Sequence, residues 1–166
     1  MPGQTMYSYV GGNPISGIDP SGLATAFILS GPIPSNPFGH IAIATTGNGV
    51  TSWGTAPLAN NSIGNYISSL RPRSTNIAVF PYTTPAQEAA MRAAVKNGLN
   101  PYDALKNNCA QVSSDAASAG GLGVNRSLLP LDLFNQIASM PGVSQIAIPI
   151  GGSIPPILNI FNPGGK

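Results

Sequence analysis

Two short runs of strand-forming residues, joined by a turn sequence, predict a β-hairpin over residues 40–54. Its two segments, HIAIA and VTSWG, are short and rich in strand-forming residues, and the Gly-Asn-Gly sequence at 47–49 is typical of a hairpin turn. Alternation along the first segment places Ile41 and Ile43 on one face and His40, with two alanines, on the other. Because those alanines are small, a bulky group can pack close to the histidine.

Helical spacing and capping residues predict three helices in the second half of the chain. A Thr-Pro pair with a glutamine two positions later predicts a helix over about 85–98. Either Asn107 or Asn108 caps the next helix, which carries Cys109 in its first turn and ends at a Gly-Gly pair. Pro130 begins a last helix that ends before the next proline.

The secondary structure of the remaining segments is predicted from their helix-breaking prolines and their apolar runs. Residues 24–39 begin apolar and then carry three prolines, so we expect an extended approach loop. Residues 55–76 are polar with one helical turn at 66–70, and a short buried strand follows at 77–80. The elements together predict an α+β domain in which a small antiparallel sheet packs against the helix that carries the cysteine.

Composition narrows the class of protein. A chain of 166 residues is the size of one domain, and only 7% of its residues are charged. Its seven Lys and Arg residues are scattered, which makes nucleic acid an unexpected partner. A single cysteine makes no internal disulfide, and one cysteine with one histidine is too few for a zinc site, so we expect no metal and no cofactor.

The termini carry two further signals. No charged segment followed by an apolar stretch is visible at the start, so we expect delivery without a signal peptide in this chain. The most apolar region, 143–161, is interrupted by prolines and glycines, and we expect a docked tail rather than a membrane span.

Residues 6–23 read MYSYVGGNPISGIDPSGL, and taken alone they predict a strand end followed by turns. The segment closely resembles the end of the Rhs repeat-associated core, with its pattern PxxxxDPxGL. The resemblance implies a shell that cuts itself after Leu23, with Asp19 as a processing residue, so that residues 1–23 end the core and 24–166 form the toxin. It also implies an Rhs shell, a secretion apparatus and a cognate immunity protein as partners. The other interpretation of Asp19 to Gly22 is a simple type I turn.

Cys109 and His40 are the candidate nucleophile and base. A thiol at a helix N-terminus faces unpaired backbone N–H groups, which favour the thiolate and can also bind an oxyanion. A histidine on a neighbouring strand can take the thiol proton and later protonate the leaving group. The other interpretation is that the cysteine is a small buried hydrophobe and the histidine is structural.

Four segments within residues 38–137 resemble, in order, the circularly permuted branch of the NlpC-like papain superfamily. They are FGHIAIATTGNGVTSWGT, TTPAQEAAMRAAV, YDALKNNCAQVSSDAASAGG and LPLDLF. In that branch a strand of the form H-x-A-I precedes an Asn-Cys pair that starts a helix, which corresponds here to His40 and to Asn108 with Cys109. Asn108 is then a helix cap and a candidate contributor to the oxyanion site.

Lecithin:retinol acyltransferase-like enzymes share this permutation, and their second polar site residue corresponds to Ser52. Histidine, asparagine or glutamine is usual at that place, so serine is a departure, although its hydroxyl can still accept a hydrogen bond from the ring. Trp53 lies on the opposite face of the strand and is expected in the core.

The resemblances imply an antibacterial effector delivered into target cells, which acts at the membrane or envelope as a cysteine hydrolase through a thioester acyl-enzyme. Low charge and the apolar tail at 143–161 favour phospholipid acyl esters as substrate. An amide of peptidoglycan or protein is the alternative, and transfer or deamidation would use the same residues. From another class, a non-enzymatic toxin would insert the tail into a membrane and leave Cys109 silent.

Overall fold

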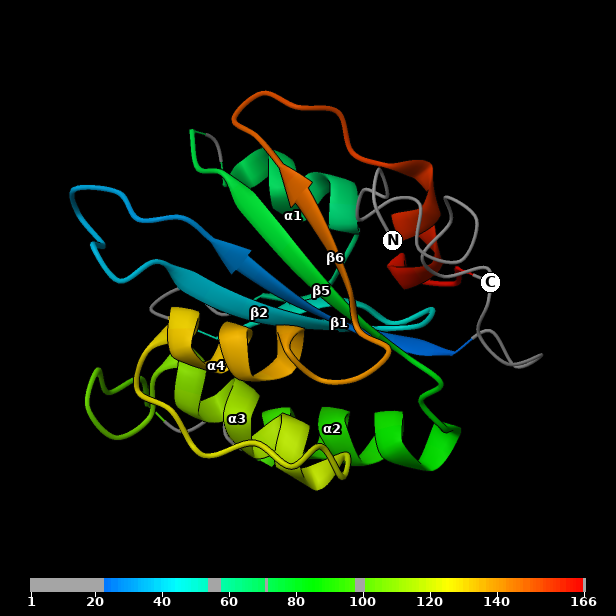
Figure 1. Ribbon diagram of the computed structural model, residues 1–166. Helices are drawn as coiled ribbons and strands as arrows, with labels where there is room; N and C mark the ends of the chain where they lie inside the picture. Colours follow the sequence, from blue (N-terminus) through cyan, green and yellow to red (C-terminus); the bar gives the residue numbers. More distant parts are fainter. Residues whose placement is uncertain (1–22, 54–57, 71, 98–100, 166) are drawn as a thin grey trace.

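The computed structural model describes residues 23–53, 58–70, 72–97 and 101–165, and this part of the chain is an α+β domain built on one antiparallel sheet (Figure 1). The strand order is β4-β3-β2-β1-β5-β6, with every neighbouring pair antiparallel. The elements in chain order are β1 (Ala24–Ser30), β2 (His40–Thr45), β3 (Gly49–Ser52), β4 (Leu58–Asn61), α1 (Ile63–Ser69), β5 (Thr75–Pro81), α2 (Pro85–Asn97), α3 (Cys109–Ala119), α4 (Pro130–Ala138), β6 (Ser144–Ile148) and the 3-10 helix η1 (Pro156–Phe161).

Helices cover both faces of the sheet. Helices α2, α3 and α4 lie on one face, and α1 and η1 lie on the other (Figure 1). Ile41 and Ile43 of β2 belong to the core under α2–α4, whereas Ala42 and Ala44 belong to the core under α1 and η1. The predicted alternation is therefore confirmed, and the two small alanines lie on the face of the sheet that α1 and η1 cover.

The segment 24–39 was predicted as an approach loop, and for its first half that prediction is wrong. Residues 24–30 form β1, a central strand that pairs with β2 on one side and β5 on the other. All seven residues are buried, because helices cover both faces of this strand. A strand covered on both faces is a continuous apolar run without alternation, which removes the pattern by which strands are recognised. The three prolines lie after the strand, in the loop that leads to β2.

The predicted hairpin and helices agree with the structure. Strands β2 and β3 pair from Ala42 with Ser52 to Thr45 with Gly49. Asn108, rather than Asn107, is the N-cap of α3: its side chain accepts a hydrogen bond from the Gln111 N–H, and the Gln111 side chain accepts one from the Asn108 N–H. This reciprocal capping fixes the helix to begin at Cys109.

The apolar tail is part of the core. Strand β6 extends the sheet at its β5 edge, and Leu158 and Phe161 of η1 are fully buried on the α1 face. A docked tail was predicted; its strand was not. No helix in the described part of the chain is long and apolar enough to cross a membrane.

Candidate active site

A cleft of about 1030 Å³ opens at the end of the sheet where β2 begins. The loop before β2, the segment after α1, the loop before α3 and the start of α4 surround it. His40, Ser52, Asn108 and Cys109, four residues predicted for the site, all line this cleft. Asp19 lies outside the described residues, and the processing role of Leu23 stays a prediction.

Cys109 is the first residue of α3 and is 6% exposed. Burial raises the pKa of its thiol above the ordinary value, while the backbone N–H groups of Ile41, Ala110 and Cys109 itself lower it. The expected effect of the helix start is present, but desolvation outweighs it because the sulfur is so well covered. Burial of Cys109 therefore opposes the thiolate that the helix start favours.

His40 is the first residue of β2 and is partly buried. Its Nε2 lies 2.6 Å from the Oγ of Ser52 on the neighbouring strand β3. Burial, followed by the charge of Arg73, lowers the pKa of His40 to about 4. The ring is therefore neutral at physiological pH, which is the state that a general base requires.

The cysteine and the histidine approach the cleft from different elements. Their meeting point is the start of β2, because the backbone N–H of Ile41, the residue after His40, faces the Cys109 sulfur. No hydrogen bond joins the thiol to the ring in the described structure, and such contacts in catalytic sites often tighten only when substrate is bound. With Nε2 engaged by Ser52, Nδ1 is the ring nitrogen that makes no hydrogen bond in the described structure.

Asn108 caps α3 and also connects two loops through hydrogen bonds of its side chain. Its Nδ2 donates hydrogen bonds to the carbonyls of Ala104, at 2.9 Å, and Leu128, at 3.1 Å. Both amide hydrogens are thus used by the walls of the cleft. The contribution of Asn108 to an oxyanion site stays a prediction. The backbone N–H groups at the start of α3 are the better donors to an oxyanion.

Two further residues of the cleft were missed from the sequence. Tyr66 of α1 is 3% exposed, and burial raises its pKa to about 12. Arg73 is the only Lys or Arg among the described residues that line the cleft, and its charge acts on Tyr66, His40 and Cys109. Both lie in or near the polar segment 55–76, where no local pattern indicated that α1 covers the end of the sheet.

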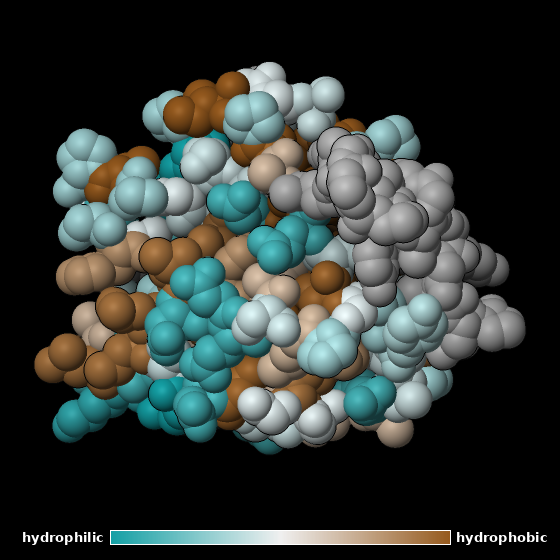
Figure 2. All heavy atoms as spheres, viewed as in Figure 1, coloured by the Kyte–Doolittle hydropathy of each residue, from teal (hydrophilic) through white to brown (hydrophobic). Residues whose placement is uncertain are grey.

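Exposed apolar side chains gather around the mouth of the cleft. Five large ones line it: Phe38, Tyr102, Leu105, Leu128 and Leu129. In Figure 2 brown surface is visible at the left edge, the side on which Figure 1 places the loop before α3 and the start of α4. We call these five residues the apolar rim.

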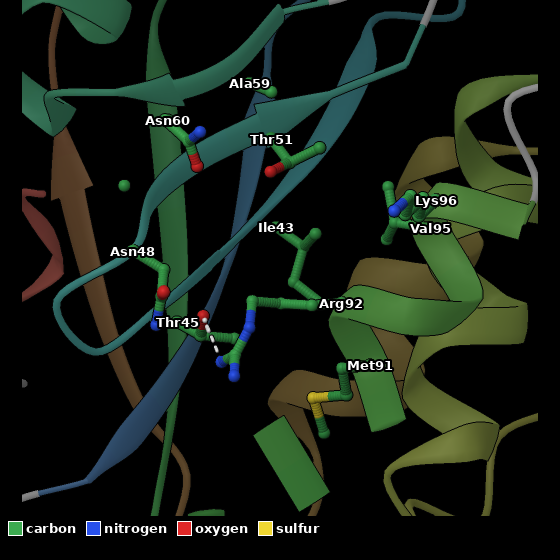
Figure 3. A pocket seen from close by; sticks show the side chains of 11 residues that line it. Ile43, Thr45, Asn48, Thr51, Ala59, Asn60, Met91, Arg92, Val95 and Lys96 are labelled. Carbon is green, nitrogen blue, oxygen red and sulfur yellow. Dashed lines mark hydrogen bonds between the residues drawn. The ribbon is translucent and has the colours of Figure 1, made fainter. Parts of the chain in front are cut away.

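A second cavity of about 230 Å³ lies between the β2–β3–β4 part of the sheet and α2 (Figure 3). Its apolar lining includes Ile43, Met91 and Val95, and Arg92 and Lys96 contribute two cations. The Arg92 guanidinium donates a 3.3 Å hydrogen bond to the Thr45 hydroxyl. No cysteine or histidine lines this cavity among the described residues.

The chain was compared with models of known protein families, with curated proteins and with solved structures, and none of them matches it. Within the described residues, no group of three or more His, Cys, Asp and Glu side chains could hold a metal ion. The case for a function therefore depends on the chemistry of the cleft.

Proposed function

We propose that the protein is a cysteine hydrolase in which Cys109 is the nucleophile, His40 the general base and acid, and Ser52 the partner of the ring. One observation carries the proposal: a thiol at a helix start shares a cleft with a neutral imidazole whose Nε2 lies 2.6 Å from the Ser52 hydroxyl. Each role has the chemical group that it requires, and the three groups come from three different elements.

The reaction would run through a thioester. His40 Nδ1 takes the proton of the thiol as Sγ attacks the substrate carbonyl carbon, and the carbonyl oxygen becomes an oxyanion at the backbone N–H groups that start α3. Collapse breaks the bond to the leaving group, which receives the proton from His40. Water, deprotonated by the same ring, then attacks the thioester and releases the acid and the thiol.

We favour an acyl ester of a lipid as the substrate. The apolar rim supports this choice, since Phe38, Leu105 and Leu128 are at least half exposed beside the nucleophile and would cover an acyl chain. The tail at 143–161 no longer contributes to the choice, because no described residue of it lines the cleft. Its burial in the core also disfavours a toxin that acts by inserting this tail.

The order of the elements fits a permuted papain-like fold, with the histidine strand first and the cysteine helix later. Together with the Rhs-like sequence at 6–23, it supports an effector toxin released from an Rhs shell, neutralised by an immunity protein and acting on the envelope of a target cell. Growth of bacteria that express the chain without its protective partner tests this role: Cys109→Ala should remove toxicity, and a variant that stays toxic would contradict it.

The substrate is tested with the purified chain, by mass spectrometry of the products formed from phospholipid vesicles and from peptidoglycan. We expect free fatty acid from the vesicles with the wild type and none with Cys109→Ala. Cleaved stem peptides without fatty acid would replace the lipid ester with an amide as substrate. If neither fatty acid nor stem peptide is released, hydrolysis of both substrate classes is contradicted.

A further inference from the structure

Serine is an ambiguous partner for a catalytic histidine. A hydroxyl both donates and accepts, so the 2.6 Å contact between His40 Nε2 and Ser52 Oγ has two possible directions. If the hydroxyl donates, the neutral ring carries its proton on Nδ1 and cannot accept one from the thiol. If the hydroxyl accepts, Nδ1 has a lone pair and can act as the base. The direction therefore decides whether this site can work.

The direction of the hydrogen bond between His40 and Ser52 depends on which group accepts the hydroxyl proton of Ser52. Two further hydroxyls, those of Ser30 and Tyr66, lie on the same face of the sheet as Ser52. Ser30 of β1 pairs with His40, and Ala42 pairs with Ser52, so Ser30, His40 and Ser52 point to one face of the sheet. Helix α1 covers that face, and Tyr66 packs there among the residues around Ala42. Tyr66 also lines the cleft beside His40 and Ser52.

Two of these hydroxyls lack a hydrogen-bond partner. The Oη of Tyr66 and the Oγ of Ser30 are fully buried and make no hydrogen bond in the described structure. Leaving a buried polar group without a partner destabilises the fold, because the group has lost its hydrogen bonds to water. Burial raises the pKa of Tyr66, whereas the Ser52 and Ser30 hydroxyls both lower it, which places both close to the phenol. Small side-chain adjustments would join the three hydroxyls.

We propose that Tyr66 is a positioning residue that accepts the Ser52 proton and so holds His40 in the tautomer that a base requires. The proposal rests on the proposed function of Cys109 and His40. The chain runs from His40 Nε2–H to Ser52 Oγ, from the Ser52 hydroxyl to Tyr66 Oη, and from the Tyr66 hydroxyl to Ser30 Oγ. It gives both orphaned hydroxyls a hydrogen-bond partner and leaves Nδ1 unprotonated.

Nitrogen NMR of the imidazole tests this directly, because His40 is the only histidine in the chain and its two ring nitrogens give an unambiguous spectrum. We expect the wild type at pH 7 to carry its proton on Nε2. Tyr66→Phe removes the acceptor of the Ser52 proton, so the proton should shift toward Nδ1. Ser30→Ala, which shortens the chain at its far end, should cause a smaller shift in the same direction.

Activity provides the second readout. The Tyr66→Phe variant should lose about 10- to 100-fold in kcat with KM changed by less than about twofold, since substrate binding is untouched. Tyr82→Phe, an exposed tyrosine that also loses one hydroxyl, is the matched control and should behave as the wild type. In Ser52→Asp/Tyr66→Phe the carboxylate can only accept, so this double variant should restore the Nε2 proton.

The outcomes separate the two proposals. A wild type that carries its proton on Nδ1, or a Tyr66→Phe spectrum identical to that of the wild type, would overturn the role of Tyr66. If the spectra shift as expected but neither the wild type nor any variant hydrolyses an ester or amide, the positioning role of Tyr66 stands and the proposed function fails.

Discussion

The two cavities of this domain lie on parts of the same sheet and differ in what their polar groups do. The second cavity, between the sheet and α2, has an apolar lining and two cations, Arg92 and Lys96, but no nucleophile. The cleft at the start of β2 brings together Cys109, His40 and Ser52 from three elements, with the ring bonded at 2.6 Å. The comparison teaches that the cleft, and not the second cavity, combines a thiol with a hydrogen-bonded imidazole, which is why we propose the cleft as the reaction site.

The largest expected effect comes from removing the nucleophile. Cys109→Ala should lower hydrolysis by about 10³-fold or more, because no other described group of the cleft can form a thioester. Initial rates on a soluble short-chain ester measure the effect, and circular dichroism checks that the fold is kept. Cys109→Ser is the matched variant and should be almost as inactive, since a hydroxyl is a far weaker nucleophile. Retention of activity in Cys109→Ala would break the distinction between the two cavities.

The next effect concerns pH and the buried ring of His40. The folded pKa of about 4 lies below the ordinary value of 6.5, so between these values the unfolded chain binds a proton that the folded chain does not. Stability is therefore fully present above pH 6.5 and should fall by about 3 kcal/mol as the pH drops to 4. Urea unfolding at several pH values measures this loss.

His40→Gln is the control for this pH dependence, because glutamine does not titrate. The difference in the free energy of unfolding between the wild type and His40→Gln should change with pH as expected for the binding of one proton between pH 6.5 and 4. If the free energy of unfolding depends on pH in the same way for both proteins, the His40 ring is as solvated in the folded protein as in the unfolded chain. The acidic limb of kcat/KM should likewise lie near pH 4 rather than 6.5.

A smaller effect is expected at the apolar rim. Leu105→Ser and Leu128→Ser should raise KM for vesicle lipid by about 3- to 10-fold and leave kcat on a short soluble ester nearly unchanged, because they remove binding shared by ground and transition states. Leu131→Ser is the matched control, since Leu131 is 56% exposed but does not line the cleft. Equal effects of all three changes would remove the rim from the substrate site.

The smallest effect should come from the second cavity. Arg92→Gln with Lys96→Gln should change hydrolysis by less than about twofold, because neither side chain lines the cleft. The same assays on the short ester and on vesicles measure this. A loss comparable to that of the rim variants would show that the two cavities act together.

Local sequence signals predicted the elements that carry Cys109 and His40. The positions of the other residues that line the cleft depend on packing between distant parts of the chain. Capping residues placed Cys109 at a helix start, and alternation placed His40 on a hairpin strand. Tyr66 and Arg73 were missed because their positions depend on α1 crossing the end of the sheet, which no short pattern encodes. Burial opposes the predicted thiolate for a related reason, since the helix start is local but the burial that raises the pKa of Cys109 comes from the whole fold.

The errors in the fold have different causes in the three strands that were missed. Strand β1 has no alternation to recognise, and β6 was hidden in a segment rich in prolines and glycines. The edge strand β4 contains a positive-φ residue, Asn60, and pairs with β3 through a register shift, which the polar sequence around it did not indicate. The α+β class and the hairpin needed only neighbouring residues and were predicted correctly.

Intact-protein mass spectrometry during turnover of an activated acyl ester tests the central claim most directly. The account predicts that the wild type gains the mass of one acyl group, that the group maps to Cys109, and that hydroxylamine removes it. Cys109→Ala should gain nothing under the same conditions. An adduct elsewhere in the chain, or hydrolysis without any dependence on Cys109, would contradict the account.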